Sequence, residues 1–235
     1  MNTISKRSRP VNTISGPRKI ISLVLKLITV ISAVLGIVMS AAAGSNSFMG
    51  GSRVFMYFTI QSNILIALIC LIGGFLLMRN SPAGNAWYVV RLVGTVSITL
   101  TGVVFVVLLA PILGSKAWNI QNTLTHAVVP LAAVLDFFVS VSGHKISRKN
   151  VFFVIVPPLF YVIYAGIGFV RGWEFARGVN YPYFFLNWGS PAGAFGFTKG
   201  LPYMGCVWWI LVLFLFLIAV GWGYAALADR LGKRI

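Results

Sequence analysis

Apolar residues dominate six long stretches of the chain and are interrupted only rarely by charged positions. The stretches cover residues 20–43, 54–78, 89–110, 119–141, 151–170 and 203–228. Each is close to the ~20 residues that a helix needs to cross a bilayer. Backbone groups inside a bilayer must bond to one another, so such stretches form helices. The pattern predicts an all-α, polytopic membrane protein built as a bundle of six transmembrane helices.

The composition supports the same class. Of the 235 residues, 58% are hydrophobic and only 9% are charged, whereas a soluble domain has about 25% charged residues. These values exclude a soluble enzyme, a nucleic-acid-binding module and a disordered chain. The two cysteines, Cys70 and Cys206, lie in apolar stretches, so no disulfide framework is expected.

The basic residues predict an orientation. The chain has 19 Lys and Arg but only three Asp and Glu, and basic residues collect in cytoplasmic segments. With both termini cytoplasmic, 14 of the 19 fall on the cytoplasmic side, and these include Lys26 and Arg91. The net charge of +16 is thereby explained by topology, and no nucleic-acid partner is needed.

This topology divides the chain into three parts. Residues 1–19 form a basic cytoplasmic N-terminal segment, 20–228 the six-helix domain, and 229–235 a basic cytoplasmic tail. The domain includes one long external segment, 171–202, before its last helix. No internal repeat is evident, so an inverted-repeat transporter is not indicated.

Polar residues cluster on one face of the second predicted helix. Thr59, Ser62 and Asn63 stand at positions i, i+3 and i+4, which places them on the same side. Polar groups in a bilayer face a cavity or a neighbouring helix. The cluster therefore indicates either a site or hydrogen bonds that hold helices together.

The fourth predicted helix contains His126, the single histidine within a predicted span. Asn122 lies one turn earlier, so its amide is expected to bond an imidazole nitrogen and to fix the tautomer. Pro130 has no N–H for the carbonyl of His126. We therefore expect the helix to depart from regular geometry at His126.

Depth in the membrane links Thr59 with His126. Both predicted helices begin at the external face, and the two residues lie about 7 and 10 Å from it at 1.5 Å per residue. A hydroxyl and an imidazole at matching depth can form a nucleophile–base pair. Asp136 lies about 15 Å further along the helix, so we expect it to pair with Arg91 or a neighbouring helix instead of orienting His126.

Three segments of the chain resemble a known family. They are Phe58-Thr59, the stretch from Asn122 to His126, and Tyr181-Pro182 followed by Asn187. These segments are similar to those of the six-pass androgen-induced gene 1 and ADTRP family and its related bacterial membrane proteins. The resemblance implies a hydrolase of fatty-acid esters of hydroxy fatty acids (FAHFAs), with Thr59 and His126 as catalytic residues, in a bacterial plasma membrane.

The chain also departs from the family pattern. Residues 60–63 are similar to the bacterial group and not to the animal one, and Asn187 stands where an acid is common. These departures concern the substrate more than the Thr/His pair.

Two functions follow as hypotheses. In the first, Thr59 attacks a lipid ester with His126 as base, and Asn63, Asn122 and Ser62 are the supporting or oxyanion candidates. In the second, the chain is a non-catalytic transporter or membrane scaffold, and its polar face is structural. No cofactor and no metal are expected, because the sequence has no phosphate-binding glycine loop and no metal-ligand cluster.

The external segment 171–202 carries nine aromatic residues and three basic ones, Arg171, Arg177 and Lys199. Trp and Tyr settle at the level of the lipid headgroups, so the segment can be an interfacial belt. Alternatively it is a lid that admits a lipid substrate from the outer leaflet. In that case the basic residues, with Tyr181 and Asn187, are candidates for binding the substrate and its carboxylate.

Overall fold

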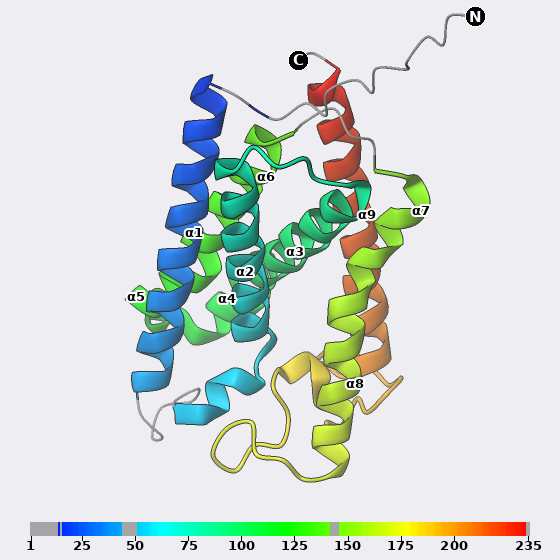
Figure 1. Ribbon diagram of the computed structural model, residues 1–235. Coiled ribbons are helices and arrows are strands. Elements are labelled where there is room, and N and C mark those ends of the chain that lie inside the picture. Colours follow the sequence, from blue (N-terminus) through cyan, green and yellow to red (C-terminus); the bar gives the residue numbers. More distant parts are fainter. Residues whose placement is uncertain (1–13, 15, 44–50, 142–145, 234–235) are drawn as a thin grey trace, which may run out of the picture.

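The computed structural model describes residues 14, 16–43, 51–141 and 146–233 and is composed mainly of helices (Figure 1). Six helical segments are long and apolar enough to cross a membrane. They are Gly16–Ala42, Phe58–Met78, Asn85–Lys116, Ile120–Val139, Arg148–Val170 and Cys206–Gly232. This confirms the predicted all-α, six-helix membrane architecture.

Three of the spans are single α-helices, and the other three combine several helical types. The single helices are α1 (Gly16–Ala42), α2 (Phe58–Met78) and α9 (Cys206–Gly232). The third span consists of α3 (Asn85–Val104), the π-helical turn η2 (Phe105–Leu109), α4 (Ala110–Leu113) and the 3-10 turn η3 (Gly114–Lys116). The fourth consists of α5 (Ile120–Thr123), the π-helical turn η4 (Leu124–Val128) and α6 (Val129–Val139). The fifth consists of α7 (Arg148–Val151), the 3-10 turn η5 (Phe152–Ile155) and α8 (Val156–Val170).

The helices run up and down, so the start of α1 and the end of α9 lie at the same end of the bundle (Figure 1). At the opposite end lie the segment 171–202, which contains the 3-10 turn η6 (Phe184–Leu186), and the 3-10 helix η1 (Gly51–Met56). Helix α1 packs on α2 and α6, and α3 packs on α2, α6 and α9. Residues 171–202 thus cover one end of the helix bundle.

The helix limits differ from the apolar stretches. The first helix begins at Gly16 instead of 20, and the last ends at Gly232 instead of 228. The third span extends to Lys116 instead of 110. Hydropathy marks the apolar part of a helix and misses the polar turns that continue beyond it. Residues 1–13 and 15 of the predicted N-terminal segment, and 234–235 of the tail, lie outside the described residues.

A buried group of charges joins α1 to α6. The Lys26 ammonium donates to the Asp136 carboxylate at 2.6 Å, and the Ser22 hydroxyl donates to the same oxygen at 2.6 Å. The Lys26 and Asp136 side chains are only 7% and 6% exposed. Gly73 on α2 leaves room for the lysine chain, since a β-carbon there would lie 3.1 Å from Lys26 Cε. The expectation that Asp136 pairs with a neighbouring helix is confirmed.

Two basic residues that the sequence analysis counted on the cytoplasmic side are instead buried among the helices. Lys26 lies inside the bundle, and Arg91 on α3 is also buried. The Arg91 guanidinium lies 3.9 Å from the Asp136 carboxylate and donates to the Ser140 side chain and to backbone carbonyls at the end of α6. A count of Lys and Arg cannot separate these residues from membrane-surface ones, because a buried acid on another helix pairs with them.

Candidate active site

The structure brings Thr59 and His126 together. Thr59 is the second residue of α2, and His126 lies in the π-helical turn η4. Thr59 Oγ1 lies 3.3 Å from His126 Nε2, and both residues are buried. The matching depth expected from the sequence is thus realised as direct contact between a hydroxyl and an imidazole.

The other imidazole nitrogen determines the tautomer. His126 Nδ1 lies 3.1 Å from the backbone carbonyl oxygen of Asn122 and 3.0 Å from Thr125 Oγ1. A carbonyl oxygen can only accept, so Nδ1 carries the proton. The Thr125 hydroxyl proton is donated to the Gln121 carbonyl at 2.8 Å, so Thr125 Oγ1 can accept as well. In the neutral ring Nε2 is then an acceptor, and the Thr59 hydroxyl donates to it.

Asn122 contributes differently from the expectation. Its side-chain amide does not bond the imidazole but donates to the Ala117 carbonyl at 2.8 Å, and its backbone carbonyl binds Nδ1 instead. In the π-helical turn the chain winds less tightly than in an α-helix. The backbone carbonyl one turn earlier thereby takes the place predicted for the side chain.

The irregular helix geometry expected near Pro130 is present at Leu124–Val128, in the turn just before the proline. The His126 ring stacks on Phe105 with centroids 3.9 Å apart and planes 21° apart. Phe105 is the first residue of the π-helical turn η2. Gly102 permits close approach of α3, since a β-carbon there would lie 3.0 Å from the His126 carbonyl oxygen. Two neighbouring π-helical turns thus hold the imidazole.

Ser62 and Asn63 are buried on the same side of α2 as Thr59, as predicted. The Ser62 hydroxyl contacts the Thr101 hydroxyl on α3 at 2.7 Å and the Thr59 carbonyl at 3.0 Å. The Asn63 amide nitrogen donates to the carbonyls of Thr59 at 2.8 Å and Thr125 at 3.2 Å. These bonds use both amide protons, so the geometry does not support Asn63 as an oxyanion donor. Both side chains connect α2 to its neighbours.

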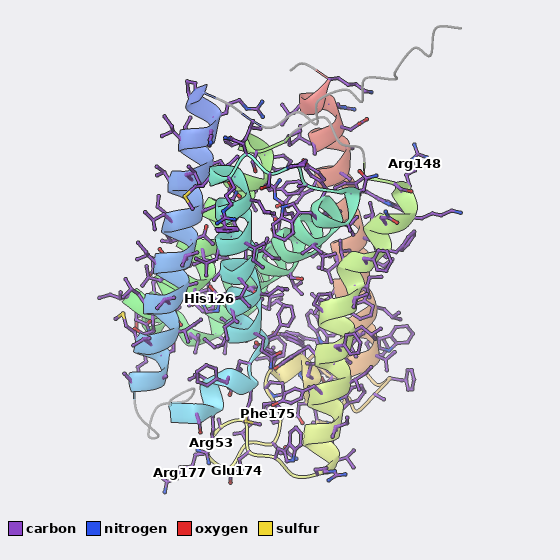
Figure 2. The ribbon with its side chains drawn as sticks, viewed as in Figure 1. Arg53, His126, Arg148, Glu174, Phe175 and Arg177 are labelled. Atoms are coloured by element: carbon purple, nitrogen blue, oxygen red, sulfur yellow. The ribbon has the colours of Figure 1, made fainter. Side chains whose placement is uncertain are left out.

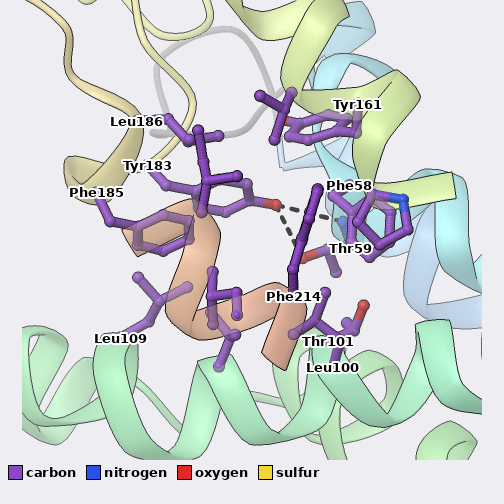
Figure 3. Close-up of a pocket in the computed structure, with 15 residues that line it drawn as sticks. Phe58, Thr59, Leu100, Thr101, Leu109, Tyr161, Tyr183, Phe185, Leu186 and Phe214 are labelled. Atoms are coloured by element: carbon purple, nitrogen blue, oxygen red, sulfur yellow. Dashed lines mark hydrogen bonds between the residues drawn. The ribbon is translucent and has the colours of Figure 1, made fainter. Parts of the chain in front are cut away.

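Tyr183 was not among the site residues proposed from the sequence. Its hydroxyl oxygen lies 3.4 Å from Thr59 Oγ1 and 3.3 Å from the Thr59 backbone nitrogen (Figure 3). It comes from the segment 171–202, where no periodicity indicates which side chain points inward. The run Tyr181-Pro182-Tyr183 was the available signal.

Two cavities meet at the contact between Thr59 and Tyr183. The larger, about 320 Å³, lies beside His126, and the smaller, about 60 Å³, lies between α2, α3, α8 and α9 (Figure 3). Thr59, Leu109 and Tyr183 line both. The remaining lining residues are mainly apolar or aromatic. A molecule with an apolar group on each side of Thr59 would fit this arrangement.

The segment 171–202 lies over the site. Residues 179 and 181–184, together with Leu201, line the larger cavity. The Tyr57 hydroxyl donates to the Phe175 carbonyl at 3.1 Å, and burial raises the pKa of Tyr57. An ion pair between Arg53 and Glu174 at 2.7 Å joins η1 to the same segment (Figure 2). The segment thus occupies the position expected of a lid.

The basic residues proposed as carboxylate ligands are not at the site. Arg171, Arg177 and Lys199 are exposed, and none lines either cavity. Figure 2 shows Arg177 at the outer end of the molecule, at a distance from His126. The positions of these residues favour contact with headgroups or water.

The two other binding candidates in the segment differ from each other. Tyr181 lines the larger cavity, as a substrate-binding residue would. The Asn187 side chain accepts from the Gly189 backbone N–H at 3.1 Å and lines neither cavity. Asn187 therefore closes a local turn.

Across the described ranges, no three His, Cys, Asp or Glu side chains gather where they could hold a metal ion. The chemistry available at Thr59 is that of a hydroxyl, an imidazole base and a neighbouring phenol. Comparisons of the chain with protein families, with curated proteins and with solved structures found no match.

Proposed function

We propose that the protein is a membrane-embedded ester hydrolase, with Thr59 as nucleophile and His126 as general base. The observation that carries the proposal is the 3.3 Å contact between Thr59 Oγ1 and His126 Nε2, with Nδ1 bound to the Asn122 carbonyl. This arrangement directs the lone pair of Nε2 at the threonine hydroxyl. The Asn122 carbonyl fixes the tautomer and the orientation of the imidazole, a role that a carboxylate has in many hydrolases.

The reaction has two halves. Thr59 Oγ1 bonds to the ester carbonyl carbon while its proton moves to His126 Nε2, and the carbonyl electrons form an oxyanion. The oxyanion collapses, the ester C–O bond breaks, and the leaving alcohol takes the proton from Nε2. Water then attacks the acyl-threonine, with Nε2 taking its proton and returning it to Thr59 as the fatty acid leaves.

The cavities favour fatty-acid esters as substrates. Thr59 lies between two spaces with apolar walls, so an ester with a chain on each side of its carbonyl can place that carbonyl at the hydroxyl. The resemblance to the androgen-induced gene 1 and ADTRP family supports FAHFA-type lipids within this class. The lid position of 171–202 favours entry from the outer leaflet.

The proposed setting is a bacterial plasma membrane with both termini cytoplasmic and 171–202 outside. The start of α1 and the end of α9 lie at one end of the bundle, which also carries the exposed Arg148 (Figure 2). Single cysteines introduced at 171–202 should react with an impermeant maleimide on intact cells, and cysteines at 146–150 should not. The opposite pattern would contradict this orientation.

The function is tested with a fluorophosphonate probe, which bonds covalently to an activated hydroxyl. We expect the purified protein to be labelled on the peptide containing Thr59, as read by mass spectrometry, and labelling to be lost in Thr59→Ala. Thr123→Ala is the matched control, because that hydroxyl bonds the Asn119 carbonyl and lines neither cavity.

Two outcomes would contradict the proposal. One is labelling of a residue other than Thr59. The other is a folded protein that neither reacts with the probe nor hydrolyses fatty-acid esters, which would favour a transporter or scaffold.

A further inference from the structure

The phenol of Tyr183 lies at the reacting atoms yet has no part in the nucleophile–base pair. Its oxygen is 3.4 Å from Thr59 Oγ1 and 3.3 Å from the Thr59 backbone nitrogen (Figure 3). Figure 3 shows the ring entering from the lid, with its hydroxyl directed at Thr59. Neither contact is needed for proton transfer between Thr59 and His126.

The protons around Thr59 can be assigned in sequence. The Thr59 hydroxyl donates to His126 Nε2, because Nδ1 already carries the ring proton. The Thr59 backbone N–H donates to the Tyr183 oxygen. The phenol proton is therefore the one that is directed at Thr59 Oγ1. Burial raises the pKa of Tyr183, so the phenol stays protonated and remains a donor at neutral pH.

We propose that Tyr183 is a catalytic residue whose hydroxyl, together with the Thr59 backbone N–H, stabilises the oxyanion of the tetrahedral intermediate. This inference rests on the proposed hydrolase function. In the intermediate, the oxyanion and Oγ1 are bound to the same carbon, so the oxyanion forms beside the two donors. The phenol proton then turns from Oγ1, which has lost a lone pair to the new bond, to the more strongly accepting oxyanion.

The cavities agree with this placement. Thr59 and Tyr183 line both the 320 Å³ and the 60 Å³ space, so an ester with one apolar group in each space would place its carbonyl beside these two residues. The contacts of 3.3 and 3.4 Å are long for hydrogen bonds, so both donors can be redirected to a stronger acceptor that forms beside Oγ1. Both donors lie beside Thr59 Oγ1, and in the intermediate the Thr59 N–H turns from the phenol oxygen to the oxyanion, as the phenol proton turns from Oγ1.

Packing fixes the ring independently of its hydroxyl. Tyr183 stacks on Phe185 with centroids 5.1 Å apart and planes 4° apart. It also packs edge-to-face with Tyr57, with ring centroids 5.8 Å apart. Tyr183→Phe keeps these contacts and removes only the donor.

The test compares Tyr183→Phe with the wild-type protein on a long-chain fatty-acid ester. We expect kcat to fall about 10²–10³-fold, KM to change less than about threefold, and the melting temperature to stay nearly constant. Affinity for a long-chain trifluoromethyl ketone, which forms an oxyanion on Thr59, should fall by a similar factor as kcat/KM. Tyr164→Phe is the control, because Tyr164 belongs to the same aromatic cluster but lines neither cavity.

Distinct results separate the two proposals. If Tyr183→Phe keeps wild-type kcat and ketone affinity while Thr59→Ala is inactive, the hydrolase stands and the role of Tyr183 is overturned. A raised KM with unchanged kcat would equally overturn it, by making Tyr183 a binding residue. A wild-type protein without esterase activity overturns both. If Tyr183→Phe does not fold, fluorinated tyrosines at 183 must give rates that depend on the acidity of the phenol, and equal rates overturn the proposal.

Discussion

Ester hydrolysis should fall by about 10²–10⁴-fold in His126→Ala and by at least as much in Thr59→Ala, with nearly unchanged melting temperatures. The double variant should be little worse than either single one, because a nucleophile and its base act as one unit. The reason lies in the contact between Thr59 Oγ1 and His126 Nε2, without which neither group can start the reaction. Measured kcat/KM values for the four proteins complete the cycle.

Thr59→Ser provides the matched control, since it retains a hydroxyl at the same position. We expect it to keep part of the activity and to remain labelled by the fluorophosphonate probe. Independent, additive and merely partial losses from the two alanine variants would assign both residues to helix packing.

The largest loss of stability is expected at the other end of the bundle. Asp136→Leu removes the carboxylate that pairs with Lys26 and lies near Arg91. The two buried cations then have no carboxylate to neutralise their charge. Breaking a buried ion pair from one side costs about 3–5 kcal/mol, so the melting temperature in detergent should fall strongly. The protein that remains folded should keep its turnover, because Asp136 does not contact His126.

Removing both partners tests whether charge is the cause. Lys26→Met combined with Asp136→Leu should recover a substantial part of the loss, because no unpaired lysine remains in the bundle. As a control, Asp229→Asn disrupts the exposed pair with Lys233 at 3.5 Å, and such pairs contribute at most about 1 kcal/mol. A double variant as unstable as Asp136→Leu alone would indicate a packing defect.

The six spans and the Thr59–His126 contact could be predicted because each depends on one simple quantity. A bilayer sets the length of an apolar helix, and depth from one membrane face sets which residues of two helices can meet. Thr59 and His126 both lie near the start of their spans, and the structure places Thr59 Oγ1 3.3 Å from His126 Nε2.

The details around the imidazole depend on quantities that a single sequence does not carry. The π-helical turn Leu124–Val128 presents the Asn122 carbonyl, and not its amide, to Nδ1. Pro130 predicts a departure from regular geometry at His126, but the side-chain pattern does not specify that the turn is π-helical. Lys26 was similarly placed with the membrane-surface charges, since its partner is 110 residues away along the chain.

The role of Tyr183 in the segment 171–202 could not be predicted from the sequence either. Helical periodicity assigns a face to Thr59 or Asn63, whereas a segment of irregular backbone has no repeat that separates inward from outward side chains. Nine aromatics in 171–202 indicated contact with lipid or with the bundle. Only the fold identifies the one whose hydroxyl contacts Thr59.

The π-helical turn at Leu124–Val128 limits which sequence changes this span can accept during evolution. A turn of this kind contains one residue more than a regular helix would use, and one residue corresponds to a rotation of about 100°. Deleting a single residue there would let α6 keep its bond to Lys26 while the part before it swings away from Thr59. A point substitution in this span can therefore leave the Thr59–His126 contact in place. A change of one residue in the length of this turn would break the contact. Homologous chains that share the site should preserve the spacing between His126 and Asp136 even where the residues between them differ.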